Sequence, residues 1–345
     1  MRLALLVPRP LAATSGGYAY DRAMLDGLRA AGHAADAIEL DGQHPLADAA
    51  TCQAAAAAFD AIPTDTVPII DGLGLPAFRE HAAALAARRT VGLIHHPTAF
   101  ETSYSGTDRA LLHDAERALM PGLARVIVTS TSTAERLVAE FGVDAGRIAV
   151  VAPGTADAPR SPGSGRGACV VLSVGALIPR KGHDVLLEAL AKLFDLDWRL
   201  TIVGSERRDP AHAAALHALA ERLAIDRQVT FTGEIDAATL ESLWQRTDIF
   251  ALATYWEGYG MAIAEALKRG IPVAVTAGGA AGALVTLQTG VACTPGDAAM
   301  LSKSLRRMIF DKDLRQSMAQ AAWTEGQTLP TWAIQCKQFA EALGA

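Results

Sequence analysis

The chain has 345 residues, of which half are hydrophobic and a fifth are charged. This length and balance are typical of two globular domains of ordinary size and exclude an intrinsically disordered protein. The formal net charge of -6, without any long basic run, argues against a nucleic-acid partner.

Neither the N-terminus nor the cysteines indicate secretion or metal binding. The first apolar run, at 2–7, is too short for a signal peptide and is broken by Pro8 and Pro10, so it predicts a strand. The four cysteines are scattered without a C-x-x-C pair, which predicts neither a zinc site nor a disulfide framework. No apolar stretch approaches the roughly 18 residues of a transmembrane helix. We therefore expect a cytoplasmic protein with reduced thiols.

Short apolar runs alternate with longer, alanine-rich amphipathic segments along the whole chain. In the first half, strands are predicted at 2–7, 35–40, 67–70, 90–95, 125–130 and 147–151, and helices between them include Tyr18–Ala31 and Asp108–Leu123. A segment rich in Pro, Gly and Ser at 152–167 is the best candidate for a linker. In the second half, strands are predicted at 168–175, 198–204, 228–233, 248–254, 271–276 and 291–295, and a helix follows Pro330.

This alternation predicts an α/β fold, because buried strands separated by helices form right-handed crossovers and parallel sheets. We expect two doubly wound, Rossmann-like domains facing each other across a cleft, at 1–160 and 161–327. Residues 328–345 form a last helix that the residues alone assign to neither half. Ligands of open α/β sheets bind beyond the carboxyl ends of the strands, so functional residues are expected in the loops there.

Two loops of the first half carry candidate binding residues. Gly16 and Gly17 follow the first strand and open a helix, where backbone amides can approach an anion, although glycine pairs are also common in plain turns. His95 and His96 lie at the end of the fourth predicted strand, where an imidazole can form a hydrogen bond with a sugar hydroxyl or a phosphate. Adjacent strand residues point to opposite faces, so at most one histidine should face a ligand, and a structural histidine is the alternative. No further metal ligand is apparent nearby.

One loop of the second half presents Arg180 and Lys181 just before a predicted helix. Cations at this position oppose the helix dipole, which favours anions there. An external anion such as a diphosphate would offset that cost, whereas a solvated pair of loop cations is the alternative.

The stretch ATYWEGYGMAIAEALKRG carries Glu257 and Glu265, eight positions apart. On one helix they would lie about 12 Å and about 80° apart, so they cannot share a face. We therefore place Glu257 in the loop and Glu265 one turn into a helix. This arrangement suits a nucleotide sugar, because one carboxylate can accept hydrogen bonds from the sugar hydroxyls and the other from the two hydroxyls of a ribose. The alternative is that both glutamates are solvated acids at the start of a helix. The turn between them offers backbone amides at Gly258, Tyr259, Gly260 and Met261.

Common motifs of other enzyme classes are missing from the sequence. It has no G-x-x-x-x-G-K-[ST] loop, no H-E-x-x-H and no G-x-S-x-G elbow. Asp311-Lys312-Asp313 matches D-x-D, but it precedes a helical pattern and predicts a helix N-cap. A required divalent metal is therefore not expected.

Taken together, the sequence resembles the retaining glycosyltransferases of the GT-B fold, in the large family 4 group. The resemblance covers nearly the whole chain, and its motifs are Gly16-Gly17, the histidine after the fourth strand, SVG…PRKGHDVLLEAL, VTFTGEI and the E-x7-E motif EGYGMAIAE. It implies a hexosyltransferase, of the EC 2.4.1 type, that needs no metal and no cofactor. Its partners would be a UDP-, GDP- or ADP-sugar and an unknown hydroxyl acceptor, with peripheral membrane contact if the acceptor is a lipid.

The resemblance also implies roles for the residues of the second domain. Arg180 or Lys181 would stabilise the departing nucleoside diphosphate, and Glu257 would contact the donor sugar. Glu265 would bind the ribose, and Ile235 would lie near the base. The amides after Glu257 would complete the donor site.

In the first domain, the resemblance implies that Gly16 and Gly17 approach the donor phosphates. His95 or His96 would be the family histidine, and the motif LIHHP does not decide between them. The last helix, from Trp332, would cross back to this domain.

The sequence departs from the family at two places. Ala176 stands where the family usually has an arginine, and Arg180 is the candidate to compensate for it. The loop at 278–284 lacks the glutamate that the family often carries there. A non-catalytic nucleotide-sugar-binding protein of the same fold is therefore one alternative. A nucleotide-sugar epimerase is another, although its acid/base pair is not evident.

Overall fold

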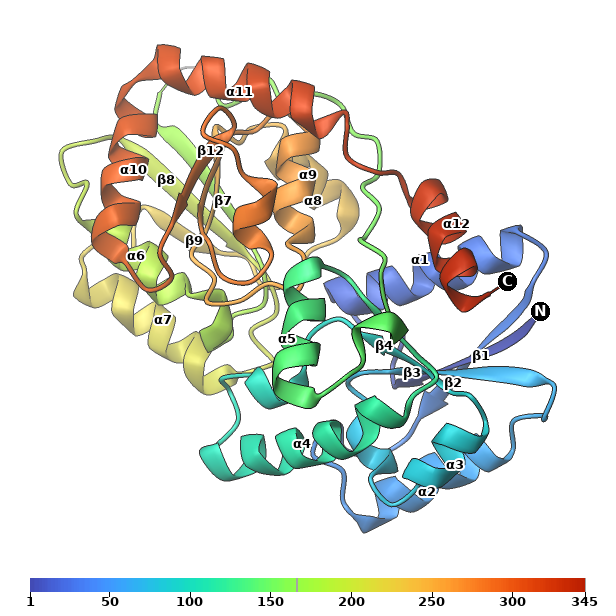
Figure 1. Cartoon of the computed structure of the whole chain (residues 1–345). Helices are drawn as coiled ribbons and strands as arrows, with labels where there is room; N and C mark the ends of the chain where they lie inside the picture. The colour runs from blue at the N-terminus through green and yellow to red at the C-terminus, as the bar shows by residue number, and fades with distance from the viewer. Residues whose placement is uncertain (166, 345) are drawn as a thin grey trace. The chain divides into compact units, whose positions relative to one another are not determined.

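The computed structural model describes residues 1–165 and 167–344, and the chain divides into two units. Unit 1 comprises Met1–Gly154 together with Pro330–Ala345, and unit 2 comprises Thr155–Leu329. Each unit has a parallel sheet flanked by helices, which confirms the predicted α/β class (Figure 1). Arg166 in the predicted linker and Ala345 at the end of the predicted last segment lie outside the described residues.

The sheet of unit 1 has six parallel strands in the order β2-β1-β3-β4-β5-β6. These strands are β1 (Arg2–Pro8), β2 (Ala34–Leu40), β3 (Thr66–Asp71), β4 (Val91–Ile94), β5 (Arg125–Val128) and β6 (Ile148–Val150). From β1 the chain adds β2 on one side of the sheet and then β3 to β6 on the other, so the strand order reverses between β1 and β3. Such a switch point is where open α/β sheets bind ligands.

The helices of unit 1 cover both faces of this sheet. They are α1 (Gly16–Ala30), α2 (Ala49–Asp60), α3 (Ala82–Ala87), α4 (Gly106–Leu119), α5 (Thr131–Phe141) and α12 (Trp332–Leu343), with short 3-10 helices η1 (Leu75–Phe78), η2 (Thr98–Phe100), η3 (Met120–Gly122) and η4 (Ala145–Arg147). Side chains of β1 alternate, so Leu5 packs with α1 and α12 while Leu6 packs with α2, α4 and α5. Phe339 of α12 meets Tyr20 of α1 with ring centroids 6.2 Å apart.

One predicted helix of unit 1 ends earlier than expected. The apolar spacing predicts a helix over Asp108–Leu123, whereas α4 ends at Leu119 and a 3-10 turn follows. Pro121 explains the difference, because it has no N–H to continue the helical hydrogen bonds, and Met120, although helical in its dihedrals, begins the 3-10 turn.

The sheet of unit 2 also has six parallel strands, in the order β12-β11-β10-β7-β8-β9. They are β7 (Cys169–Val174), β8 (Trp198–Val203), β9 (Val229–Phe231), β10 (Ile249–Leu252), β11 (Val273–Thr276) and β12 (Gly290–Cys293). Its switch point lies between β7 and β10.

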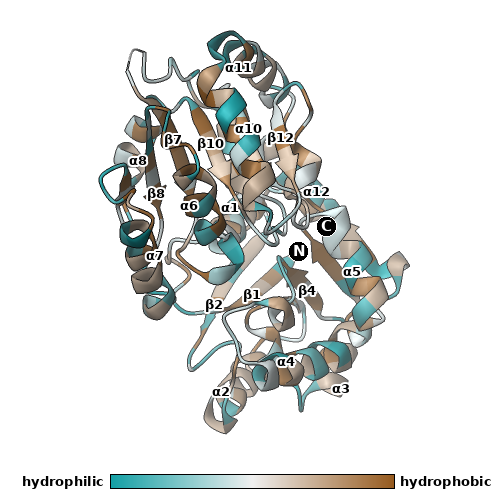
Figure 2. Cartoon of the chain, turned by 90° about the vertical axis from the view of Figure 1, so that its left-hand side faces the viewer, coloured by the Kyte–Doolittle hydropathy of each residue, from teal (hydrophilic) through white to brown (hydrophobic). Residues whose placement is uncertain are grey.

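The helices of unit 2 are η5 (Pro179–Lys181), α6 (His183–Ala191), α7 (Pro210–Arg222), α8 (Ala237–Trp244), α9 (Met261–Lys268), η6 (Ala281–Leu284), α10 (Ala298–Phe310) and α11 (Lys312–Gly326). Alternate strand residues build the two cores: Val171 and Ile249 pack with α6, α7 and α10, whereas Leu172 and Phe250 pack with α8 and α9. Figure 2 shows the hydrophobic strands of this sheet beneath helices with polar outer faces.

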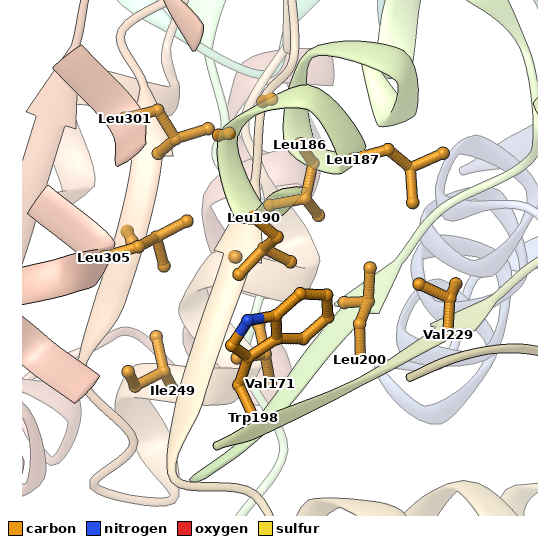
Figure 3. Packing of buried hydrophobic residues seen from close by; sticks show 14 of the residues in the cluster. Val171, Leu186, Leu187, Leu190, Trp198, Leu200, Val229, Ile249, Leu301 and Leu305 are labelled. Carbon is orange, nitrogen blue, oxygen red and sulfur yellow. The ribbon is translucent and has the colours of Figure 1, made fainter. Parts of the chain in front are cut away.

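Trp198 lies in the core on one face of the unit 2 sheet. Figure 3 shows its indole ring among leucine, isoleucine and valine side chains, including Leu190 and Leu200. The indole nitrogen donates to the Leu193 carbonyl oxygen at 3.2 Å, so the buried ring leaves no unpaired donor. Burial of each of the leucine, isoleucine and valine side chains around it stabilises the fold by about 1.5–3 kcal/mol.

Among the described residues, no helix is long and apolar enough to cross a membrane. Residues 152–165, the described part of the predicted linker before Arg166, contain neither helix nor strand.

Candidate active site

Two loops meet at the switch point of unit 2. Parallel pairing of β7 with β10 aligns Val171 with Ile249, so the carboxyl ends of both strands lie at the same edge. The loop after β7 leads through η5 to α6, and the loop after β10 leads to α9. A backbone hydrogen bond from the Tyr255 amide to the Arg180 carbonyl oxygen, at 2.8 Å, joins the two loops.

A buried ion cluster connects these loops. The Nζ atom of Lys181 lies 2.7 Å from Oε1 of Glu257, and a guanidinium nitrogen of Arg180 lies 3.8 Å from the same oxygen. Arg180 also donates to the Trp256 carbonyl oxygen at 2.7 Å. The side chains of Arg180, Lys181 and Glu257 are only 14%, 16% and 10% exposed, so solvent screens their charges weakly.

The charges of this cluster hold Glu257 in its ionised form. Burial acts to raise the pKa of Glu257, but Lys181 and then Arg180 outweigh that effect and hold the pKa below its usual value. The sequence left an external anion or solvent as the alternatives for these two cations. In the structure both lie beside an internal carboxylate, which is 76 residues from Lys181 in sequence. The formal charges of Lys181, Arg180 and Glu257 sum to +1.

Sequence reasoning missed the residues that shape the Glu257 loop. The Thr254 hydroxyl donates to the carbonyl oxygens of Arg180 and Trp256, both at 3.1 Å. The Glu257 amide donates to the Gly278 carbonyl oxygen at 3.1 Å. Gly279 has a φ of +62°, and a Cβ there would collide with the Glu257 carbonyl oxygen. The glycine pair that follows β11 was the available signal for this contact.

The structure has Glu257 in the loop and Glu265 inside α9, as their eight-residue spacing predicts. Gly260 is the N-cap of α9, and Met261 is its first residue. The carboxylate of Glu265 makes no hydrogen bond or ion pair with the residues that the structure describes. Its neighbour Arg269 instead pairs with Glu241 at 2.6 Å.

Burial is the main cause that raises the pKa of Glu265; Arg269 lowers this pKa and Glu241 raises it. Glu265 therefore has a partly buried carboxylate available to a polar ligand. Among the other predicted donor residues, Gly258 and Tyr259 are partly buried in the same turn, and burial raises the pKa of Tyr259. Ile235 lies in the loop between β9 and α8 and packs against the Phe250 side of the core.

In unit 1, the two histidines lie beyond the end of β4 and take different surroundings. The strand ends at Ile94, one residue earlier than predicted. Nε2 of His95 lies 2.8 Å from Oδ1 of Asp21 and 3.6 Å from Oδ2 of Asp71. The ring of His96 instead lies 6.5 Å from that of Phe100. Gly17, in the first turn of α1, lies directly against the His95 ring.

The carboxylates of Asp21 and Asp71 were not recognised from the sequence. Asp21 lies in α1, and Asp71 is the last residue of β3, so the sheet order brings both to the end of β4. The acid that ends a buried strand was the available signal. By spacing alone the three ligand atoms, all within 4.8 Å of one another, could hold a metal ion, although a hydrogen bond already joins two of them.

The pKa values of His95 and Asp71 are both shifted in this cluster. Burial lowers the pKa of His95, but Asp21 and Asp71 raise it, and the net shift is upward. Burial, followed by the charge of Asp21, raises the pKa of Asp71 to about 7, against the opposing effect of His95.

We expect Asp71 to make unit 1 less stable as the pH rises from about 4 to about 7. Over this range the folded chain keeps a proton on Asp71 that the unfolded chain has lost, so the free energy of unfolding falls by up to about 1.4 kcal/mol per pH unit. Denaturant unfolding of the wild type and of Asp71→Asn at several pH values measures this slope. The slope should become flatter in Asp71→Asn and stay unchanged in the exposed control Asp60→Asn. Equal slopes in all three proteins would contradict the expectation.

Two protein-family models match successive parts of the chain. The model "Glycosyl transferase 4-like domain" matches residues 9–154, and the model "Glycosyl transferases group 1" matches residues 156–324. The boundary between the matches falls at the boundary between the two units.

Curated relatives are similar over part of their length. The D-inositol 3-phosphate glycosyltransferase of Corynebacterium efficiens is 28% identical over 65% of this chain and 57% of its own length. D-inositol 3-phosphate glycosyltransferase 2 of Catenulispora acidiphila is 31% identical over 58% of this chain and 53% of its own length. The chain thus spans less than two thirds of each relative.

Solved structures share the fold over the whole chain. Sucrose-phosphate synthase from Thermosynechococcus elongatus superposes with a TM-score of 0.82 at 21% identity, covering 100% of this chain and 98% of that one. Alr3699/HepE of Anabaena, solved in complex with UDP-glucose, gives a TM-score of 0.76 at 19% identity and full coverage of both chains. At these identities the likeness establishes the architecture.

Proposed function

We propose, on the premise that this chain belongs to the group 1 glycosyl transferases with the GT-B fold, that it is a retaining, metal-independent glycosyltransferase. The donor is a nucleoside-diphosphate sugar and the acceptor carries a hydroxyl group. The UDP-glucose held by the similar Anabaena protein supports a nucleotide-sugar donor, and we leave UDP-, GDP- and ADP-sugars as candidates.

The observation that carries this proposal is the arrangement at the switch point of unit 2. Lys181 and Arg180 converge on Glu257 with a net positive charge, and α9 begins four residues later with the uncommitted carboxylate of Glu265. A cationic pair suits the diphosphate, and a carboxylate suits the vicinal hydroxyls of a ribose. These are the chemical groups that a nucleotide sugar presents.

In the proposed reaction, the acceptor oxygen forms a bond to the anomeric carbon on the face from which the diphosphate leaves. The bond from that carbon to the diphosphate oxygen breaks, and the acceptor proton passes to the leaving diphosphate. Lys181 and Arg180 stabilise the negative charge that develops on the diphosphate, so catalysis is electrostatic and needs no protein nucleophile. Because Ala176 supplies no charge, Arg180 takes the place of the family's usual arginine.

In unit 1, the backbone amides of Gly16 and Gly17, in the first turn of α1, are candidate donors to an anionic group. His95 contributes an imidazole for a sugar hydroxyl, since its side chain is 20% exposed and its ring lies against Gly17. We assign the family role to His95 rather than His96 on this contact.

A thermal-shift screen against UDP-, GDP- and ADP-sugars, followed by donor hydrolysis with and without EDTA, tests the proposal. We expect one nucleotide class to raise the melting temperature and support slow hydrolysis that EDTA leaves unchanged. Loss of activity with EDTA would refute the metal-free mechanism. Binding without hydrolysis or transfer to any acceptor would favour the non-catalytic alternative, and no binding at all would refute the transferase proposal.

Glu265→Ala is expected to weaken binding of the nucleoside diphosphate about tenfold, because a charged acceptor of ribose hydrogen bonds is lost. Calorimetric titration with the nucleotide identified in the screen measures this change. The carboxylate has no partner among the described residues, so the melting temperature should change little. Glu221→Ala, an exposed substitution in α7, is the matched control. Unchanged affinity in Glu265→Ala would remove Glu265 from the donor site.

A further inference from the structure

Asp21 lies in α1 of unit 1. Its side chain is fully buried, and its Oδ1 atom lies 2.8 Å from Nε2 of His95. Its other oxygen, Oδ2, is buried and has no hydrogen-bond partner among the described residues. Burying a carboxylate without a hydrogen-bond partner costs free energy. The hydrogen bond with the ring of His95 therefore offsets part of the cost of burying Asp21.

A proton must lie between the carboxylate oxygen and the ring nitrogen at this distance. A carboxylate only accepts hydrogen bonds, and imidazole is the stronger base, so Nε2 carries the proton and donates it to Asp21. The other ring nitrogen, Nδ1, forms no hydrogen bond with any residue that the structure describes, while 20% of the His95 side chain is exposed. This leaves Nδ1 as the nitrogen available to a ligand.

Neighbouring groups also restrict the orientation of the ring. A Cβ at position 17 would lie only 3.1 Å from Cδ2 of His95, so glycine leaves just enough room for the imidazole. The Tyr20 ring meets it edge-on at a centroid distance of 5.1 Å, and the Tyr20 hydroxyl is held by the Val151 carbonyl oxygen at 3.0 Å. The acidic groups that face His95 are Asp21 from α1 and Asp71 from β3.

We propose that Asp21 is a positioning residue, which fixes His95 in the Nε2–H tautomer so that Nδ1 is presented to a hydroxyl of the bound sugar. In its neutral form the ring then accepts a hydrogen bond from that hydroxyl. This role in the reaction rests on the proposed function, whereas the tautomer itself is a property of the free protein.

Nuclear magnetic resonance of this chain with 15N-labelled histidine tests the tautomer without any substrate. At a pH above the titration of the ring, we expect wild-type His95 to carry its proton on Nε2. Asp71→Asn, whose carboxylate lies 3.6 Å from the ring and beyond hydrogen-bond distance, should keep this tautomer, and Asp21→Ala should lose it. A proton on Nδ1 in the wild type, or a metal ion bound by the three residues, would overturn the proposal.

A double-mutant cycle then tests whether Asp21 acts through His95. We expect Asp21→Ala to lower kcat about tenfold in the wild-type background and less than about twofold in the His95→Ala background, because coupled residues are non-additive. Asp21→Asn should recover part of the loss, since its amide oxygen still accepts from Nε2. An equal loss in both backgrounds would show a structural role and refute the positioning role. If no variant turns over any donor, the proposed function fails while the tautomer result stands.

Discussion

Lys181→Ala is expected to lower kcat for donor turnover by about 10²–10³-fold while changing donor affinity by less than about tenfold. The ammonium lies 2.7 Å from Glu257 in a cluster with little solvent exposure, so it is held in place before the charge on the diphosphate develops. A fixed cation stabilises the departing diphosphate more than the intact donor, and its loss therefore affects turnover more than binding. Single-turnover kinetics at saturating donor and calorimetric titration measure the two quantities separately.

The matched control for this prediction is Lys303→Ala, which removes an exposed lysine from α10 of the same unit. Its kinetics should equal those of the wild type. Circular dichroism at the assay temperature must show that Lys181→Ala remains folded, because the substitution removes the nearer of the two cations from the buried Glu257. A folded Lys181→Ala protein with wild-type kcat would exclude the cation from catalysis.

Glu257→Gln is expected to lower the free energy of unfolding of unit 2 by about 3 kcal/mol near neutral pH. The substitution removes the negative charge that lies beside Lys181 and Arg180, two cations of low exposure. Because the folded pKa of Glu257 is lowered, its stabilising effect is present above the unfolded pKa of about 4.3 and is lost as the pH falls through the folded value. The difference between variant and wild type should therefore shrink in acid.

Denaturant unfolding of a double-mutant cycle measures this effect. Lys181→Met combined with Glu257→Gln removes one charge of each sign, so the pair should cost less than the sum of the single substitutions. Glu206→Gln, which removes the exposed partner of His217, is the control and should change stability by less than about 1 kcal/mol. Additive losses across the cycle would show that the buried pair is not coupled.

Much of the architecture follows from local patterns that need no tertiary information. Period-2 and period-3.6 spacing of apolar residues predict the strands and helices of both halves, because burial of one face requires those spacings. The spacing of Glu257 and Glu265 predicts that a helix begins between them, since helical geometry separates two acids eight residues apart. Where a predicted helix end is wrong, a nearby residue accounts for it. Pro121 ends a helix that the apolar spacing would continue.

The pairing of charges was decided by the tertiary structure alone. Lys181 meets Glu257 because β7 and β10 are neighbours in the sheet, although the two residues lie 76 positions apart. His95 meets Asp21 across 74 positions for the same kind of reason, through the order of β1, β3 and β4. Patterns in the sequence suffice to predict the fold class, the resemblance to group 1 glycosyl transferases and the loops that carry polar residues. Which of those residues share a charge or a proton depends on strand order, and no periodicity in a single sequence encodes that order.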